Sequence, residues 1–313
     1  MSIEISADDA NLAQLQDVPV AEVLQSIDRG LVHLPTYREL YYRWERQQWQ
    51  TQEIDFIADR IQWEDMSDEE RGSHIATLAT FFQGEACVTD ALAPYVLAAP
   101  EEEMRIYLTT QLVDEARHTV FFDHFFSTVL EIDATSLEEA LAMARQHMNS
   151  ATSHILLEAL PETADRIRQE PRSLAHLIDG VVLYHLIVEG TLALAGQRAL
   201  LERFREEHIF PSLCVGMTAL TRDESRHVLF GVRFLRDMLQ RDPAYASVIR
   251  DALNHYAPIA LEGLTPSAEM IERMLAENDD PWKALRYGRD SLRKKLKVIG
   301  LEIELPEIPS LTW

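Results

Sequence analysis

Apolar residues along this chain recur three and four positions apart, which is the spacing of a helix face, and alternating runs typical of strands are few. Four such stretches are long enough to cross a helical bundle. We therefore predict an all-α protein with a four-helix bundle core and additional helices. The long helices are expected at about 68–98, 101–130, 172–203 and 211–241, and shorter ones at about 19–30, 37–47, 136–157, 244–262, 267–277 and 281–298.

Local signals support these limits, and nothing divides the chain into separate domains. Ser67 followed by Glu70 is a capping-box pattern, which predicts a helix start at this point. No low-complexity linker or solenoid repeat interrupts the chain. We expect a single domain over residues 1–313, with N-terminal helices at about 19–47 and the bundle core at about 68–241.

The composition narrows the classes of protein that fit. The formal net charge of -23 would repel the phosphates of nucleic acid or of an anionic membrane surface. The two cysteines, Cys87 and Cys214, are too few for a disulfide framework and are expected as buried, reduced thiols. The N-terminus has no apolar signal core, and no run of 18 or more apolar residues is present. We therefore expect a cytoplasmic protein without a membrane span.

Two short motifs carry the candidate chemistry. The segment TRDESRHVLFG places Glu224 and His227 three residues apart, so on a helix both side chains lie on one face. Alone, such a pair is usually solvated helix surface. The segment QLVDEARHTVFF repeats it with Glu115 and His118, and DEARH and DESRH agree at four of five positions. Two copies on two long helices indicate one shared metal site.

Two further glutamates interrupt the apolar faces of the other long helices. Glu85 lies in ATFFQGEACVTDAL, and Glu189 lies in VVLYHLIVEGTLALAG, the most apolar run of the chain. A lone buried carboxylate is costly unless an arginine or a water satisfies it. Each half of the chain thus has one Glu and one Glu-x-x-His, which is the ligand set of a dinuclear centre in a ferritin-like bundle. Four carboxylates neutralise two divalent ions and suit iron or manganese, although the spacing does not exclude zinc.

The predicted metal ligands are Glu85, Glu115, His118, Glu189, Glu224 and His227. Ligating histidines usually donate their other ring N–H to a carboxylate. Asp114 and Asp223, each directly before a ligand glutamate, are the candidates for this role. Our hypothesis is a crosswise pairing, in which each Asp contacts the histidine of the other motif. Arg117 and Arg226 either pair with these carboxylates or face the solvent.

The length and the stretch WERQQWQTQEIDF resemble the radical-generating small subunit of ribonucleotide reductase. In that subunit a tyrosine four residues after the first ligand histidine carries the radical, whereas this chain has Phe122 there. The tail also lacks a tyrosine after Tyr287, where the reductase subunit uses one to relay the radical. A manganese/iron reductase subclass with Phe at the radical position is the alternative, because Trp49 and Asp223 match the Trp and Asp of the reductase relay. That alternative requires a large catalytic partner.

The sequence resembles more closely the ligand-binding oxidase group of the same superfamily. GEACV, YHLIVEGTLALAG and DESRH are similar to the ligand segments of that group. The group has a valine three residues after its first ligand Glu and a tyrosine five residues before its third, and its metal site joins the two by an ether crosslink. This chain has Val88 and Tyr184 at those places.

The resemblance implies an oxidoreductase that activates dioxygen. Its centre would be a heterodinuclear Mn/Fe site, with di-iron as a variant, and would bind the carboxylate of a long-chain fatty acid. A two-electron oxidation would join Tyr184 to Val88, and an external lipid or hydrocarbon-like molecule would be oxidised by the same chemistry. Relatives are often homodimers, so we expect one here. Five apolar residues are candidates for a channel lining: Phe81, Phe121, Phe122, Ile187 and Leu192.

A third class is a protein that binds metal or fatty acid without catalysis. It predicts no dioxygen consumption by the reduced, metal-loaded form. An amine oxygenase fits less well, since that group typically has a histidine four residues before the last ligand Glu, where this chain has Leu220.

Overall fold

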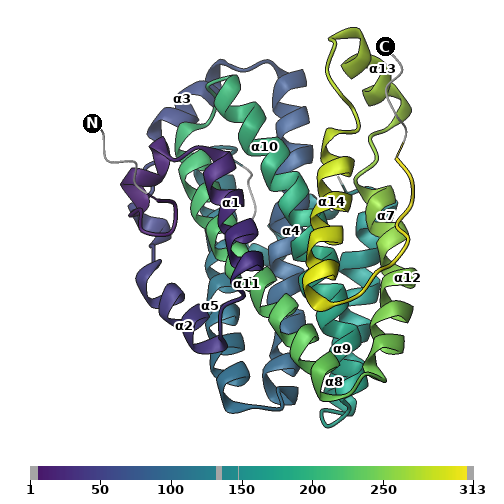
Figure 1. Ribbon diagram of the computed structural model, residues 1–313. Coiled ribbons are helices and arrows are strands. Elements are labelled where there is room, and N and C mark those ends of the chain that lie inside the picture. The colour runs from purple at the N-terminus through teal and green to yellow at the C-terminus, as the bar shows by residue number, and fades with distance from the viewer. Residues whose placement is uncertain (1–5, 132–135, 147, 309–313) are drawn as a thin grey trace.

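The computed structural model describes residues 6–131, 136–146 and 148–308, and over these ranges the chain is helical and has no β-strand (Figure 1). The predicted all-α, ferritin-like fold is confirmed. Four long segments form the bundle: α4 (Asp68–Ala98), α5 (Glu102–Thr128), a composite helix of α9 (Leu174–Val181), η4 (Val182–Ala193) and α10 (Leu194–Glu206), and α11 (Pro211–Arg241). α5 packs against both α4 and α11, and η4 packs against α11.

Shorter helices cover this bundle. α1 (Val20–Val32) packs along α11, α2 (Tyr37–Arg46) packs along α5, and α14 (Lys283–Ile299) packs on η4 and α11. α1 and α14 come from opposite ends of the sequence and meet on the same side of the bundle (Figure 1). The other elements are η1 (Leu12–Asp17), η2 (Thr51–Glu53), α3 (Ile57–Asp65), α6 (Leu137–Arg145), α7 (Ser150–Ser153), η3 (His154–Ala159), α8 (Leu160–Gln169), α12 (Tyr245–Gly263) and α13 (Ala268–Ala276).

Two long helices have the limits that the sequence predicts. α4 begins after Ser67, whose hydroxyl accepts from the N–H of Glu70 while the Glu70 carboxylate accepts from the N–H of Ser67. This reciprocal capping box satisfies two N–H groups that a helix start leaves unpaired. α11 begins at Pro211, whose missing N–H costs nothing in the first turn.

The single helix predicted at 136–157 is wrong. α6 ends well before that limit, and α7, η3 and α8 form a separate segment that continues past it; residue 147 lies outside the described part of the chain. Asn149 starts the new segment because its side chain accepts the backbone N–H of Thr152. The segment passes Pro161 because the π-helical turns of η3 come directly before it, where regular i to i−4 bonding is already interrupted.

The composite helix Leu174–Glu206 is long and apolar enough to cross a membrane by length and composition, with a mean hydropathy of 1.6 over its most apolar window. However, 83% of that window is buried inside the protein. Most of its apolar surface is therefore buried in the core of the bundle.

A polar layer crosses the bundle between two apolar clusters. On α5, Tyr107 and Leu108 belong to one cluster, and Phe121 and Phe122 belong to the other. The buried residues between them on α5 are mostly polar: Thr110, Gln111, Asp114, Glu115, His118 and Thr119. This layer is where the predicted ligands lie.

Candidate metal centre

Six side chains converge in the polar layer from the four long segments of the bundle. Glu85 comes from α4, Glu115 and His118 from α5, Glu189 from η4, and Glu224 and His227 from α11. None is more than 6% exposed. Within each of two overlapping groups, the candidate ligand atoms all lie within 4.8 Å of one another: Glu85, Glu115, His118 and Glu224 form the first group, and Glu115, Glu189 and His227 form the second. The structure thus brings together all six predicted ligands.

Two of the carboxylates face both histidines, with one oxygen toward each. Glu115 has Oε2 3.5 Å from Nδ1 of His118 and Oε1 3.3 Å from Nδ1 of His227. Glu224 has Oε1 3.5 Å and Oε2 3.4 Å from the same two nitrogens. The other two carboxylates each lie near one histidine, Glu85 at 3.2 Å from His118 Nδ1 and Glu189 at 3.4 Å from His227 Nδ1. Glu115 and Glu224 are thus placed where their oxygens could help to hold a metal ion beside either histidine.

The other ring nitrogen of each histidine meets the Asp of the opposite motif. Nε2 of His118 lies 3.3 Å from Oδ2 of Asp223, and Nε2 of His227 lies 3.2 Å from Oδ2 of Asp114. The crosswise pairing expected from the sequence is therefore present. Such contacts fix the orientation of each ring and leave Nδ1 to face a metal.

A buried arginine joins the two aspartates. Arg226 is 2% exposed, and its Nη2 lies 2.8 Å from Oδ2 of Asp114 and 2.7 Å from Oδ1 of Asp223. Arg117 contacts the same two carboxylates at 3.0 Å and 3.4 Å. Both arginines thus pair with the aspartates, which decides the alternative that the sequence leaves open. Burial acts to raise the pKa of Asp223, but Arg226, His118 and Arg117 together outweigh it and hold that pKa well below its usual range.

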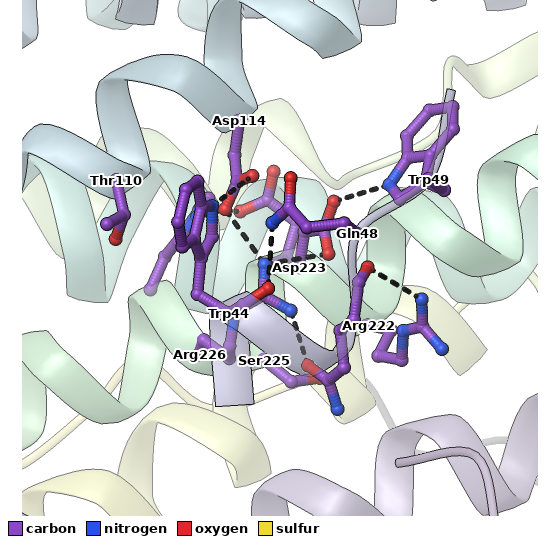
Figure 2. Close-up of polar contacts among 12 residues, drawn as sticks. Trp44, Gln48, Trp49, Thr110, Asp114, Arg222, Asp223, Ser225 and Arg226 are labelled. Atoms are coloured by element: carbon purple, nitrogen blue, oxygen red, sulfur yellow. Dashed lines mark hydrogen bonds and ion pairs between the residues drawn. The ribbon is translucent and has the colours of Figure 1, made fainter. Parts of the chain in front are cut away.

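Two indole N–H groups complete this network (Figure 2). Trp49 donates to Oδ2 of Asp223 over 2.7 Å, and Trp44 donates to Oδ1 of Asp114 over 3.0 Å. Figure 2 shows the two indoles reaching the aspartates from opposite sides. Trp44 has no signal in the sequence, because only the packing of α2 on α5 brings it against Asp114. Each histidine therefore contacts an aspartate, and each aspartate accepts a hydrogen bond from a tryptophan.

Several polar atoms of the centre make no hydrogen bond within the described part of the chain. They are Oε2 of Glu115, Oε2 of Glu189, Oε2 of Glu224 and Nδ1 of His227, and all are buried. Unpaired buried carboxylate oxygens are costly, and two divalent cations would satisfy them. The donor set of carboxylate oxygens and imidazole nitrogens is one that iron and manganese accept. The residues present therefore fit a dinuclear centre.

The protonation of the four glutamates follows from their burial. Burial raises the pKa of Glu85 to about 8, although His118 acts to lower it. Burial and the charge of Glu224 raise the pKa of Glu189 well above its ordinary value. For Glu115, burial also acts to raise the pKa, but His227 and His118 together outweigh it and lower the pKa. Without cations the centre therefore keeps protons on some carboxylates, which divalent ions would displace.

Gln111 and His185 support Glu189, although neither was predicted from the sequence. Nε2 of Gln111 donates to Oε1 of Glu189 over 2.8 Å and also lies 3.4 Å from Oε1 of Glu115. Burial lowers the pKa of His185 to about 3, so the ring is neutral and its Nε2–H can donate to Oε1 of Gln111, 3.1 Å away. This bond fixes the orientation of the amide. The spacing of four residues from Gln111 to Glu115 is the signal that could have found it.

The predicted crosslink pair lies beside the centre, within one apolar cluster. Tyr184 is fully buried, and its hydroxyl donates to Oε1 of Glu115 over 3.0 Å. Burial and the charge of Glu115 raise the pKa of Tyr184 well above its ordinary value, so the hydroxyl keeps its proton. Val88 is 4% exposed and lies one turn beyond Glu85 on α4.

A cavity of about 640 Å³ opens between α4, α6, η3 and α8. Its wall includes Cys87 and Ala91, which flank Val88 along α4, and Leu156 from η3. The five residues predicted to line a channel do not border this cavity. They belong to the core instead: Phe121, Phe122 and Ile187 are fully buried, and Phe81 and Leu192 pack against buried apolar residues.

A family model described as the small chain of ribonucleotide reductase matches residues 32–262. The chain belongs to the ribonucleotide reductase small-chain family. Similar solved structures include three variants of an R2-like ligand-binding oxidase with an anaerobically reconstituted Mn/Fe cofactor. A valine-to-isoleucine variant is 25% identical, with 85% of this chain and 94% of that chain covered and a TM-score of 0.73. With the same coverage, a glycine-to-phenylalanine variant is 26% identical with a TM-score of 0.71, and a tyrosine-to-phenylalanine variant is 25% identical with a TM-score of 0.73.

These findings confirm the resemblance to the ligand-binding oxidase group. The chain is an oxidoreductase of this dimetal family. The family match ends at residue 262, so α13 and α14 lie beyond it.

Proposed function

We propose that this chain is a Mn/Fe oxidase that activates dioxygen at a centre held by Glu85, Glu115, His118, Glu189, Glu224 and His227. The observation that carries the proposal is the pair of overlapping groups that share Glu115, together with Glu224, which places one carboxylate oxygen near each histidine. The similar oxidase structures carry Mn/Fe cofactors. Four carboxylates and two imidazoles suit manganese and iron, and two iron ions would fit the same donors.

The surrounding residues prepare the ligands for metal binding. Arg226 contacts both Asp114 and Asp223, and each aspartate can accept the Nε2–H of a histidine and so hold its Nδ1 toward the centre. The ligands are buried, so water has little access to the reaction. When bound, the metals supply the one-electron changes that the reduction of dioxygen needs.

The oxidation that we propose first is an ether bond between the hydroxyl oxygen of Tyr184 and Cβ of Val88. Forming this bond removes one hydrogen from each residue, which amounts to two electrons and two protons. Reduction of one dioxygen to two waters takes four electrons and four protons, so bound manganese and iron ions would supply the other two electrons and solvent would supply the other two protons. Glu115, whose Oε1 accepts the Tyr184 hydroxyl over 3.0 Å, is the first acceptor for the phenolic proton.

A long-chain fatty acid is the ligand that we propose, and a lipid or hydrocarbon-like molecule the substrate class. The cavity of about 640 Å³ supports this, because it lies along α4, where Cys87 directly before Val88 in the sequence is part of its wall, and is lined largely by apolar residues. An acyl chain needs such a wall, while its carboxylate would bind the metals. The net charge of -23 argues against nucleic acid as a partner.

We also propose that the protein is a cytoplasmic homodimer. Ile106, Val113 and Val120 recur every seven residues on the outer face of α5 and are 44%, 48% and 52% exposed. An exposed apolar stripe of this kind supports self-association. Light scattering on the metal-loaded protein would give twice the chain mass, and a single-chain mass at micromolar concentration would contradict the dimer.

The second candidate is a manganese/iron radical-generating subunit of ribonucleotide reductase, with Phe122 in place of the radical tyrosine. One chain of contacts favours it, because Trp49 donates to Asp223 and Asp223 contacts His118. This subunit would bind a large catalytic partner and restore nucleotide reduction to it.

Peptide mass mapping separates these functions. Metal-free protein is loaded with Mn(II) and Fe(II), with and without air, and digested. The oxidase predicts joined peptides that carry Val88 and Tyr184 and are two hydrogens lighter, formed only with air. Separate peptides, despite two bound metals and consumed dioxygen, would move the reductase subunit to first place. A reduced, loaded protein that consumes no dioxygen would indicate a binding protein without catalysis.

A further inference from the structure

The helix that carries Glu189 has an irregular register with a direct effect on the centre. η4 is a π-helix, in which residues five apart are bonded rather than residues four apart. On a regular α-helix, Tyr184 and Glu189 would point about 140° away from each other. In η4 both side chains are linked to Glu115. Tyr184 donates directly to Oε1 of Glu115, and Glu189 is linked through Gln111, whose Nε2 contacts an oxygen of Glu189 and an oxygen of Glu115. A return to α-helical register would turn one of them away from the centre.

Lys295 on α14 contacts this π-helix next to the ligand. Its ammonium group donates to the carbonyl oxygen of Gly190 over 2.7 Å and also to Oγ of Ser291. The side chain is fully buried. Within the described ranges, no carboxylate lies at ion-pair distance from it, and the nearby Asp28 pairs with the exposed Lys294 instead. Lys295 thus donates to a backbone carbonyl one residue after Glu189 instead of pairing with a carboxylate.

The two helices are shaped for this contact. A Cβ at Gly190 would lie 3.1 Å from Cε of Lys295 and 2.7 Å from the carbonyl oxygen of His185, so a side chain there would push the lysine away. A Cβ at Gly288 on α14 would lie 3.3 Å from Cγ2 of Thr191, so this glycine lets α14 approach η4 closely. Thr191 adds a second bond for the register, because its hydroxyl donates to the carbonyl oxygen of Leu186, five residues earlier, over 2.7 Å.

A lysine is a costly residue for this position. Burying an ammonium group without a carboxylate is unfavourable, and replacing a buried charge by an apolar side chain of similar volume is often neutral or stabilising. Burial lowers the pKa of Lys295 to about 7, which is consistent with that cost. If this position contributed only to the stability of the fold, methionine or leucine would be more favourable there than lysine.

We propose that Lys295 is a positioning residue, which holds the π-helical register of η4 through the carbonyl of Gly190 and thereby points Glu189 at the second ligand group. The inference rests on the proposed dimetal function. It assigns a role in the centre to α14, which lies outside the part of the chain that the family model matches.

The test compares K295M and K295L with two control variants in the full chain. S291A removes the second acceptor of Lys295 but leaves the bond to Gly190, and K294M removes the neighbouring exposed lysine. Metal binding is measured by titration with Mn(II) followed by elemental analysis, and hydrogen exchange of residues 186–195 is measured on the metal-free proteins. Melting temperatures report the stability of each variant.

The expected result is specific to one metal. Wild type, S291A and K294M bind two ions, whereas K295M and K295L bind the second ion about tenfold more weakly or worse. Exchange of residues 186–195 rises in the Lys295 variants without a fall in melting temperature. Folded variants with wild-type affinity for both ions would overturn the inference, and so would unfolding of both, because Lys295 would then hold the fold rather than a ligand. A wild-type protein that binds fewer than two ions would instead contradict the proposed function, while the exchange comparison would still test the register.

Discussion

Tyr184 donates its hydroxyl hydrogen to Oε1 of Glu115 over 3.0 Å, and the same oxygen lies 3.3 Å from Nδ1 of His227. The phenol is therefore held against a candidate ligand rather than against an inert core group. Because burial and Glu115 raise the pKa of Tyr184 well above its ordinary value, it stays a hydrogen-bond donor at neutral pH. The Tyr184 hydroxyl is therefore in direct contact with the centre where we propose that oxidation takes place.

The variant Y184F should keep both metal ions but lose the crosslink. The phenyl ring fills the same buried space, and all six candidate ligands remain. Peptide mapping after loading in air should then show no loss of two hydrogens. Y95F is the matched control, because the Tyr95 ring lies 5.6 Å from that of Tyr184 and its buried hydroxyl has no hydrogen-bond partner in the described structure. A crosslinked Val88 peptide in Y184F would show that another residue is the partner.

The variants D223N and D114N should each weaken one metal position by about 10- to 100-fold. Asp223 orients His118 and Asp114 orients His227, so the losses should fall on different ligand groups. Metal titration with element-specific detection measures this. D59N is the control, since Asp59 is buried on α3 and accepts the N–H groups of Ser212 and Leu213, away from the centre. If D59N lowered metal affinity as much as the other two, the effect would be one of folding.

R226M should destabilise the metal-free protein by about 3–5 kcal/mol, because it leaves two buried carboxylates without their shared partner. Urea unfolding followed by circular dichroism measures the change. R203M removes an exposed pair with Glu207, in which the side chains are 51% and 44% exposed, and should cost no more than about 1 kcal/mol. Equal unfolding midpoints for the two variants would mean that Arg117 alone is enough to compensate Asp114 and Asp223.

Lys295 should make stability depend on pH in the alkaline range. The unfolded chain takes up the proton at an ordinary pKa of 10.5, whereas burial delays uptake in the folded protein to about 7. Between these values the unfolded state binds more protons, so the unfolding free energy rises with pH, at up to about 1.4 kcal/mol per unit. K295M should lack this slope. The unfolding free energies of both proteins at pH 7.5 and 9.5 test it, and a constant difference between them would contradict the lowered pKa of Lys295.

The sequence can predict which candidate ligands meet in the polar layer because their signals are local. Glu-x-x-His spacing on a long amphipathic helix defines which side chains share a face, and the motif occurs twice. Ser67 and Pro211 mark the starts of α4 and α11 by cap chemistry that needs no knowledge of the fold. Four inward carboxylates on four helices then have one place to meet.

The π-helical stretches are beyond such reasoning. Periodicity arguments assume 3.6 residues per turn, and the run from Val182 to Ala193 is apolar on almost every side, so nothing in it marks an extra residue per turn. The sequence could therefore place Tyr184 near the centre only through the resemblance of its segment to the ligand-binding oxidase group. The same is true of η3, where the bonding pattern decides that Pro161 does not end the helix.

Partners that are distant in sequence are the other gap. Trp44 and Asp114 lie 70 positions apart, and Gly190 and Lys295 lie 105 positions apart. Neither pair has a spacing rule, because each depends on how one helix packs on another. For this reason the sequence does not decide whether Arg226 pairs with the aspartates or faces the solvent. The residues that line the cavity also differ from those expected for a channel.

The order of synthesis gives the apolar helix Leu174–Glu206 a further consequence. It leaves the ribosome before α11, and α14, which covers part of η4, comes later than both. A nascent chain therefore exposes its most apolar helix before the helices that cover it have been synthesised. Incomplete chains of this kind aggregate readily. Slow translation through α12, α13 and α14 would lengthen that exposure, so the yield of this protein in a host cell should depend on chaperone supply more than the stability of the folded protein suggests.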